Sequence, residues 1–85
     1  MREIEFTPVA EHQLSRLPRS VQARFAKQLP RLQEDPMRPR AGLDVKPLRA
    51  HREWRLRIGH YRAIYGVDEH SIVFLRFGHR STVYR

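Results

Sequence analysis

The fold is decided by one stretch of the chain, Trp54-Arg55-Leu56-Arg57-Ile58-Gly59-His60-Tyr61-Arg62-Ala63-Ile64-Tyr65. Its first five residues alternate apolar and charged side chains, a pattern typical of a strand with one buried face. Gly59-His60 suits a two-residue turn with glycine in the first position. Aromatic and β-branched residues then continue to Val67, which favours a second strand. The stretch therefore predicts an antiparallel hairpin with strands at Trp54–Ile58 and Tyr61–Val67.

The predicted hairpin sorts its side chains onto two faces. If Gly59-His60 forms the turn, Ile58 lies opposite Tyr61 and the pairing continues outward from there. One face then carries Leu56, Ile58, Tyr61 and Ala63, and the other carries Arg55, Arg57 and Arg62. Arg57 and Arg62 are expected directly opposite each other, with Cβ atoms roughly 5 Å apart, where like charges oppose folding. Nothing acidic in these two strands offsets the repulsion, so this arginine face is predicted to bind an anion.

A further strand, Ile72–Phe77, is expected to extend both faces. Because side chains alternate along a strand, the side chains expected to face the core are those of Val73, Leu75 and Phe77. The same alternation leaves Phe74 and Arg76 on the arginine face. Continued past Gly78, the chain is expected to place at the end of the sheet the residues His79, Arg80 and Tyr84. Arginine on an exposed sheet face also prevents edge-to-edge aggregation, which explains any one of these residues taken alone. Four arginines on one face beside a tyrosine hydroxyl favour a functional surface.

The first half of the chain is expected to form a short strand and two helices. Ile4–Phe6 is the strand, and Thr7-Pro8 is typical of a helix start, with a hydroxyl cap and proline in the first turn. This helix is expected to end at Leu17-Pro18. A second helix is expected over Val21–Glu34, and Pro30 is expected to kink it or to tighten its last turns locally, because proline lacks the N–H donor.

A loop over Met37–Leu43 and a weak strand over Val45–Arg49 connect the two halves. Pro47 places this strand at a sheet edge, because proline cannot donate to a strand ladder. The order β-α-α-β-β-β-β predicts an α+β fold, in which a two-helix hairpin packs on one face of a small, mainly antiparallel twisted sheet. A length of 85 residues allows a single domain over residues 1–85.

The chain is strongly basic. Seventeen Lys and Arg residues against nine Asp and Glu residues give a net charge of +8. Such an excess favours polyanionic partners: nucleic acid, an acidic protein or, less readily, an anionic membrane. Most of these cations are arginines, whose guanidinium groups match phosphate oxygens in geometry. The composition by itself fits a solvated basic surface equally well.

Other features disfavour whole classes of protein. The chain has no cysteine for a disulfide or a thiolate metal site, and His12, His51 and His70 lack metal-ligand spacing. We therefore expect no metal and no cofactor. No apolar run is long enough to cross a bilayer, and residues 1–6 lack the features of a signal peptide. A cytoplasmic protein without a membrane partner is expected.

Several motifs carry a resemblance to a known group of proteins. They are the stretch at residues 54–65 preceded by Leu48-Arg49, the segment Phe77-Gly78-His79-Arg80, and the end Val83-Tyr84-Arg85. With the helix ends at residues 17–18 and 35–36, they resemble the RelE/ParE toxin superfamily of type II toxin–antitoxin systems, and within it the RelE-like branch. The resemblance covers nearly the whole chain and implies the fold predicted above.

The resemblance implies a metal-independent endoribonuclease, an mRNA interferase that cleaves mRNA in the A site of the 30S ribosomal subunit, near 16S rRNA. Matching positions imply catalytic roles for Arg55, Arg57, Arg62, Arg80 and Tyr84. The same four arginines, joined by Arg76, are expected to bind the RNA. The resemblance also implies translation inhibition and growth arrest, relieved by an acidic RelB-like antitoxin.

The implied reaction is attack by a ribose 2′-OH on the adjacent phosphate, which leaves a 2′,3′-cyclic phosphate and a 5′-OH. Arginines stabilise the charge that develops, but Arg57 cannot replace a lysine that sheds a proton. Tyr84 is expected to move the proton, because guanidinium groups around a phenol favour the phenolate. His79 is the second candidate, since imidazole titrates near neutrality, and His60 is the third.

Two alternatives belong to other functional classes. One is a ParE-like inhibitor that acts on DNA gyrase through protein contacts and without catalysis. The other is an RNA-binding module that does not cleave. The sequence distinguishes them from the interferase only through the set of Arg55, Arg57, Arg62, Arg80 and Tyr84.

Overall fold

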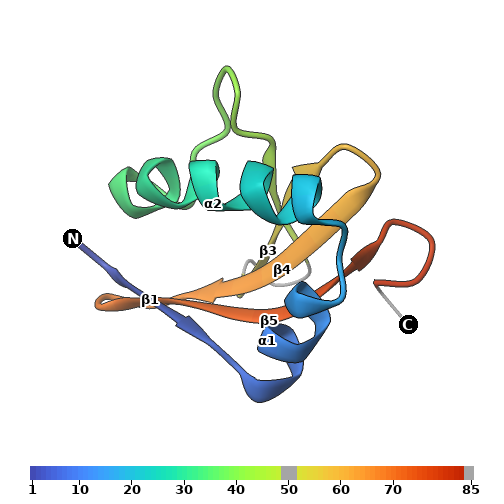
Figure 1. The fold of residues 1–85 in the computed structure, drawn as a ribbon. Coiled ribbons are helices and arrows are strands. Elements are labelled where there is room, and N and C mark those ends of the chain that lie inside the picture. Colours follow the sequence, from blue (N-terminus) through green and yellow to red (C-terminus); the bar gives the residue numbers. More distant parts are fainter. Residues whose placement is uncertain (49–51, 84–85) are drawn as a thin grey trace.

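The computed structural model describes residues 1–48 and 52–83, which form two helices and a five-stranded sheet (Figure 1). In chain order the elements are β1 (Glu3–Phe6), α1 (Pro8–Ser15), α2 (Arg19–Glu34), β2 (Val45–Pro47), β3 (Glu53–Ile58), β4 (Tyr61–Val67) and β5 (Ser71–His79). The strands lie in the order β1-β5-β4-β3-β2. β1 runs parallel to β5, and the other pairs are antiparallel. The predicted α+β fold is confirmed.

Helix α1 lies along β5 beyond the end of β1 (Figure 1). The Thr7 hydroxyl caps it as predicted, accepting the Ala10 N–H at 3.1 Å. β1 pairs only with residues 71–74 of β5, so the next part of that strand needs other partners. Gln13 of α1 supplies one, because its side-chain oxygen accepts the Phe77 N–H at 2.9 Å. The short helix thereby satisfies the backbone of β5 where the sheet would otherwise have an open edge.

Helix α2 lies across one face of the sheet and turns an apolar stripe toward it (Figure 1). Its buried residues are Val21, Phe25 and Leu32. The helix begins at Arg19, two residues earlier than predicted, and continues through Pro30 to its end. Both Pro30 and Ala26 are exposed. The helix tolerates the proline because the Ala26 carbonyl, which loses its N–H donor, lies on the exposed side.

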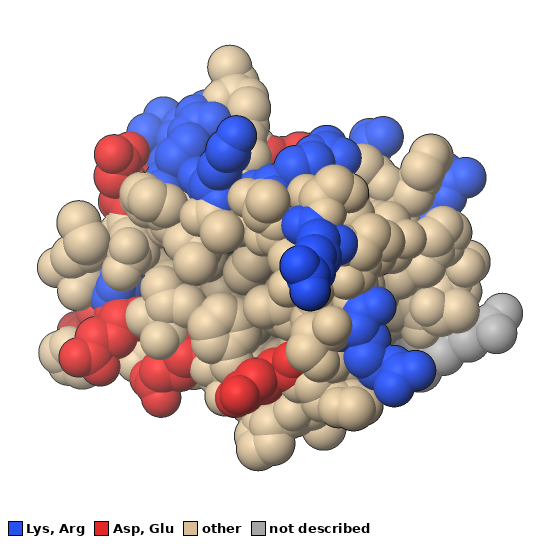
Figure 2. All heavy atoms as spheres, in the orientation of Figure 1, with Lys and Arg blue, Asp and Glu red and all other residues tan. Residues whose placement is uncertain are grey.

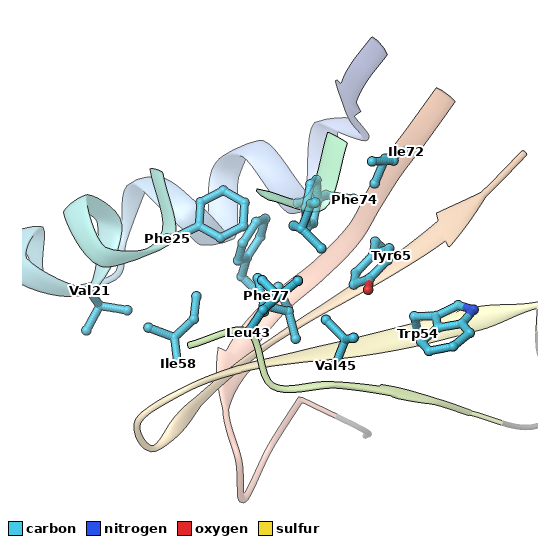
Figure 3. Close-up of a cluster of buried hydrophobic side chains, with 14 residues drawn as sticks. Val21, Phe25, Leu43, Val45, Trp54, Ile58, Tyr65, Ile72, Phe74 and Phe77 are labelled. Carbon is cyan, nitrogen blue, oxygen red and sulfur yellow. The ribbon is translucent and has the colours of Figure 1, made fainter. Parts of the chain in front are cut away.

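The core between α2 and the sheet is built around aromatic rings (Figure 3). Phe25 meets Phe74 and Phe77 edge-on, with ring centroids 4.9 and 4.8 Å away, an arrangement that aromatic pairs prefer. Tyr65 is fully buried, and its hydroxyl donates to the Pro36 carbonyl at 2.6 Å. Burial raises the pKa of the Tyr65 hydroxyl, so this group remains a neutral donor. The bond ties the end of α2 to the centre of the sheet.

The pairing of β4 with β5 corrects the predicted facing of the last strand. Ile64 lies opposite Arg76, but the next residue, Tyr65, lies opposite Phe74, so Leu75 is an extra residue in β5. Phe74 therefore joins Phe77 in the core, whereas Leu75 and Val73 do not belong to the buried cluster. The prediction for Phe77 is confirmed, and those for the other three are wrong. One inserted residue reverses the facing of all residues on one side of it.

The bulge can be tested by a pair of substitutions in adjacent residues. Phe74→Ala is expected to lower the free energy of unfolding by about 3–5 kcal/mol, because it opens a cavity among buried rings. Leu75→Ala is expected to cost about 1 kcal/mol, because its side chain is only partly removed from water. Urea denaturation of both variants measures the two losses. The opposite order would support simple alternation and contradict the bulge.

Candidate functional site

The arginine face predicted from the hairpin is present. Arg57 is the register partner of Arg62, and Arg55 is the partner of Ile64. The row through Arg55 extends across four strands in the order Lys46, Arg55, Ile64, Arg76. Ile64 is fully buried yet lies outside the cluster beneath the helices. The arginine face thus has an apolar floor at its centre, covered by the longer side chains around it.

A hollow of about 580 Å³ opens on this face. Its lining residues are Lys46, Leu48, Arg55, Arg62, Arg80 and Ser81. Three of the five positions to which the sequence assigned catalysis, Arg55, Arg62 and Arg80, therefore surround one space. Their guanidinium groups are permanent cations with several N–H donors each, a combination suited to binding phosphate oxygens.

Two turns hold these arginines together. The Arg62 guanidinium donates to the carbonyl of Gly59 at 2.9 Å and to that of Tyr61 at 3.0 Å, so it is fixed against the β3–β4 turn. The backbone N–H of Arg80 donates to the His60 carbonyl at 2.8 Å, which joins the turn after β5 to the same place. These bonds explain why residues from β4 and from the end of β5 meet at one hollow.

The segment after β5 folds over the sheet at Gly78, the register partner of Arg62. Val83 is buried, and a Cβ atom on Gly78 would lie 3.4 Å from the Cβ of Val83. A side chain at this position would therefore press on Val83. The glycine lets the segment after β5 lie close to the sheet beside Arg62.

Carboxylates on the same face offset part of the arginine charge. The Asp44 carboxylate lies 3.3 Å from an Nη of Arg55 and 3.8 Å from one of Arg57. Glu53 lies 3.7 Å from an Nη of Arg76. The expectation that the hairpin strands carry no offsetting acid is therefore wrong, because β3 begins at Glu53 and Asp44 lies beside its other end. The pairing of β2 with β3 brings Asp44 there, and its carbonyl accepts the Arg57 N–H.

Arg57 and Arg76 share the arginine face but do not line the hollow. The Arg57 side chain is 52% exposed and donates to the Gly59 carbonyl at 3.3 Å. Arg55, in contrast, is only 14% exposed and is held by Asp44. The face thus has an inner guanidinium group at Arg55 and an outer one at Arg57.

The two histidine candidates for proton transfer, His79 and His60, do not line the hollow. His79 is the register partner of Tyr61, on the side of the sheet that carries the core. Its ring contacts the rings of Tyr61 and His60, and its Nδ1 lies 2.8 Å from the Ser81 hydroxyl. His60, the third candidate, is exposed in the β3–β4 turn. Tyr84 lies outside the described residues, as do Arg49, His51 and Arg85.

Sequence reasoning missed Lys46 and Ser81 as lining residues. Lys46 and Asp44 are two residues apart, which indicates that both face the same side of the sheet, but only the pairing with Arg55 shows which side that is.

Within residues 1–48 and 52–83, no group of three or more histidines or acidic residues is arranged to hold a metal ion. None of the helices in that part of the chain is both long enough and apolar enough to cross a membrane.

The chain is similar in sequence and fold to proteins of bacterial and archaeal toxin–antitoxin systems. A family model described as the ParE toxin of the type II toxin–antitoxin system parDE matches residues 4–84. No curated protein sequence matches the chain significantly.

Solved structures match over nearly the whole chain. A chain of the RelBE2 toxin–antitoxin complex from Mycobacterium tuberculosis is 30% identical, with 93% of this chain and 98% of that chain covered and a TM-score of 0.75. The archaeal RelE–RelB complex from Pyrococcus horikoshii OT3 gives 26% identity, coverages of 96% and 98%, and a TM-score of 0.80. The RelB–RelE complex from Methanococcus jannaschii gives 25% identity, 94% coverage of both chains, and a TM-score of 0.78.

Asp44 is expected to compete with an anionic ligand for Arg55 and Arg57. Asp44→Asn should therefore strengthen the binding of a single-stranded oligonucleotide by up to about fivefold, in keeping with the roughly 0.2–1 kcal/mol of an exposed ion pair. Fluorescence anisotropy at constant salt measures the change. Glu69→Gln, which alters the net charge equally at an exposed residue between β4 and β5, is the matched control. Equal strengthening by both variants would show that net charge, and not this site, controls binding.

Proposed function

The chain belongs to the ParE toxin family of type II toxin–antitoxin systems, within the RelE/ParE superfamily, and we propose that it is an mRNA-cleaving toxin. It acts as a metal-independent endoribonuclease on mRNA in the ribosomal A site and thereby arrests translation. The observation that carries this proposal is the convergence of Arg55, Arg62 and Arg80 on one hollow. Solubility alone does not require three guanidinium groups to surround one space, because like charges repel one another.

The reaction fits the charges around the hollow. Attack of a 2′-OH on the neighbouring phosphate concentrates negative charge on the phosphoryl oxygens, and fixed cations stabilise that charge most when they need not rearrange. Arg62 is held by the β3–β4 turn and Arg55 by Asp44. Arg80 approaches from the other turn. Arg57 and Arg76, which lie on the same face outside the hollow, bind the RNA on either side of the scissile phosphate.

A role for Tyr84 rests on the family resemblance and on its place in the sequence, directly after Val83. Its phenol would take the proton of the attacking 2′-OH, since cations nearby favour the phenolate. His79 is the weaker candidate, because its ring is directed to Tyr61, His60 and Ser81 rather than to the hollow.

We further propose an acidic RelB-like antitoxin as the protein partner. The three similar structures named above are all antitoxin–toxin complexes. The net charge of +8 favours an acidic chain. Figure 2 shows that basic side chains gather over α2, whereas acidic ones gather below, over β1 and α1. An acidic partner would therefore approach the basic side of the molecule.

A second candidate function is inhibition of DNA gyrase without catalysis. The observation in its favour is that the matching family model is a model of ParE toxins. The two functions differ in their need for the arginine hollow: mRNA cleavage requires a phosphate to bind there, and gyrase inhibition does not.

Arg62→Ala separates these functions. We expect it to slow mRNA cleavage by about 100-fold or more, since it removes one preorganised group that stabilises the transition state. Primer extension on ribosome-bound mRNA measures cleavage, and a supercoiling assay run beside it measures gyrase activity. Arg19→Ala, which removes an equal charge from the exposed surface of α2, should cleave like the unaltered toxin. Loss of supercoiling without any RNA cuts would overturn the interferase in favour of the gyrase inhibitor.

Tyr84→Phe tests the assignment of the proton-transfer group. The variant keeps the aromatic ring and loses the hydroxyl, so growth arrest should be lost, with cleavage slowed by about 100-fold or more. Growth of cells that express the variant without antitoxin measures the effect, and circular dichroism with thermal unfolding checks that the fold is kept. Full toxicity of a folded Tyr84→Phe variant would contradict the role of the tyrosine.

A further inference from the structure

The proposed cleavage needs a proton donor that the arginines cannot provide. When the bond between phosphorus and the 5′ oxygen breaks, this oxygen leaves as an alkoxide and must receive a proton. Guanidinium groups stay protonated and serve as fixed charges. Arg55, Arg62 and Arg80 therefore account for charge stabilisation at the hollow, and the source of the proton has to be sought among the other residues around it.

Lys46 is placed for this task. It lies on the edge strand β2, is the register partner of Arg55, and lines the same hollow as Arg62 and Arg80. An ammonium group carries three N–H donors on a flexible four-carbon stem. It can release a proton to an alkoxide, because an alkoxide is a far stronger base than an amine.

The other lining residues of the described chain are less suitable. Leu48 is apolar, and the Ser81 hydroxyl lies 2.8 Å from Nδ1 of His79. The Asp44 carboxylate, which lies on the same face, is shared by Arg55 and Arg57. Among the ion pairs of residues 1–48 and 52–83, none involves Lys46. Its exposed side chain is therefore able to follow a leaving oxygen, whereas Arg55 is held in place.

We propose that Lys46 is the general acid of the cleavage reaction, an inference that rests on the proposed function. As the 2′ oxygen loses its proton to the general base, it forms a bond to phosphorus. The bond from phosphorus to the 5′ oxygen breaks, and its electron pair remains on that oxygen. The Lys46 ammonium transfers one proton to it, which yields the 5′-OH, and the neutral amine regains a proton from water.

The proposal also accounts for a departure in the strand positions. The resemblance places Arg57 where a lysine would serve proton transfer, and arginine cannot take over that role. Lys46 supplies an ammonium group to the arginine face from the neighbouring strand, two register positions away from Arg57.

The decisive experiment compares Lys46→Arg with the unaltered toxin on two mRNAs bound to ribosomes. One has the natural linkage at the cleavage site, and the other has sulfur in place of the bridging 5′ oxygen. A thiolate leaves without a proton, so a missing general acid matters only for the oxygen linkage. Lys46→Arg keeps the positive charge but loses the transferable proton. We expect cleavage of the oxygen linkage to slow by about 100-fold or more, and cleavage of the sulfur linkage to change only a few-fold.

Each other outcome has a definite meaning. Normal cleavage of both linkages would show that Lys46 contributes charge alone, and equal slowing of both would show a structural role; either result overturns the proposal and leaves the interferase function intact. If the unaltered toxin cuts neither mRNA, the proposed function fails and the role of Lys46 fails with it. Lys27→Arg, the same substitution at an exposed residue of α2, is the matched control and should cleave both linkages normally.

Discussion

The pairing of β3 with β4 around Gly59 is the constraint on which both the core and the arginine face depend. Because side chains alternate along a strand, this register decides that Leu56 faces the helices while Arg55 and Arg57 face away. Gly59 has a φ of +60°, a conformation that favours glycine, and its carbonyl accepts hydrogen bonds from Arg57 and Arg62. A slip of one residue would turn guanidinium groups into the core.

The arginine face is tolerated because carboxylates on the same face offset part of the repulsion between its guanidinium groups. Asp44 bridges Arg55 and Arg57, and Glu53 pairs with Arg76. These pairs are at least partly exposed, so each contributes little to stability and can be given up at low cost. The same carboxylates hold the guanidinium groups in position when no ligand is bound. Among the described residues, the lining of the hollow itself contains no carboxylate.

The hollow itself depends on contacts between parts of the chain that are distant in sequence. The turn after β5 is joined to the β3–β4 turn by the hydrogen bond from Arg80 to His60, and Val83 packs where Gly78 leaves space. On the other side, the edge strand β2 adds Lys46 next to Arg55. The helices contribute no lining residue: α2 covers the opposite face of the sheet, and α1 lies along β5. The scaffold and the site therefore use opposite faces of the same strands.

The sequence by itself determined the features that are local: the order of the elements, the Thr7 cap, the hairpin at Gly59, and the common face of Arg55, Arg57 and Arg62. Alternation, caps and turn glycines involve neighbouring residues, so they can be read without a partner strand. Only the tertiary structure decided how separate strands align. The bulge that buries Phe74 leaves no mark on the alternation of β5, because an extra residue is recognised only against the partner strand. The places of Lys46, Asp44 and the Arg80 turn depend likewise on register between distant segments, which a local pattern does not specify.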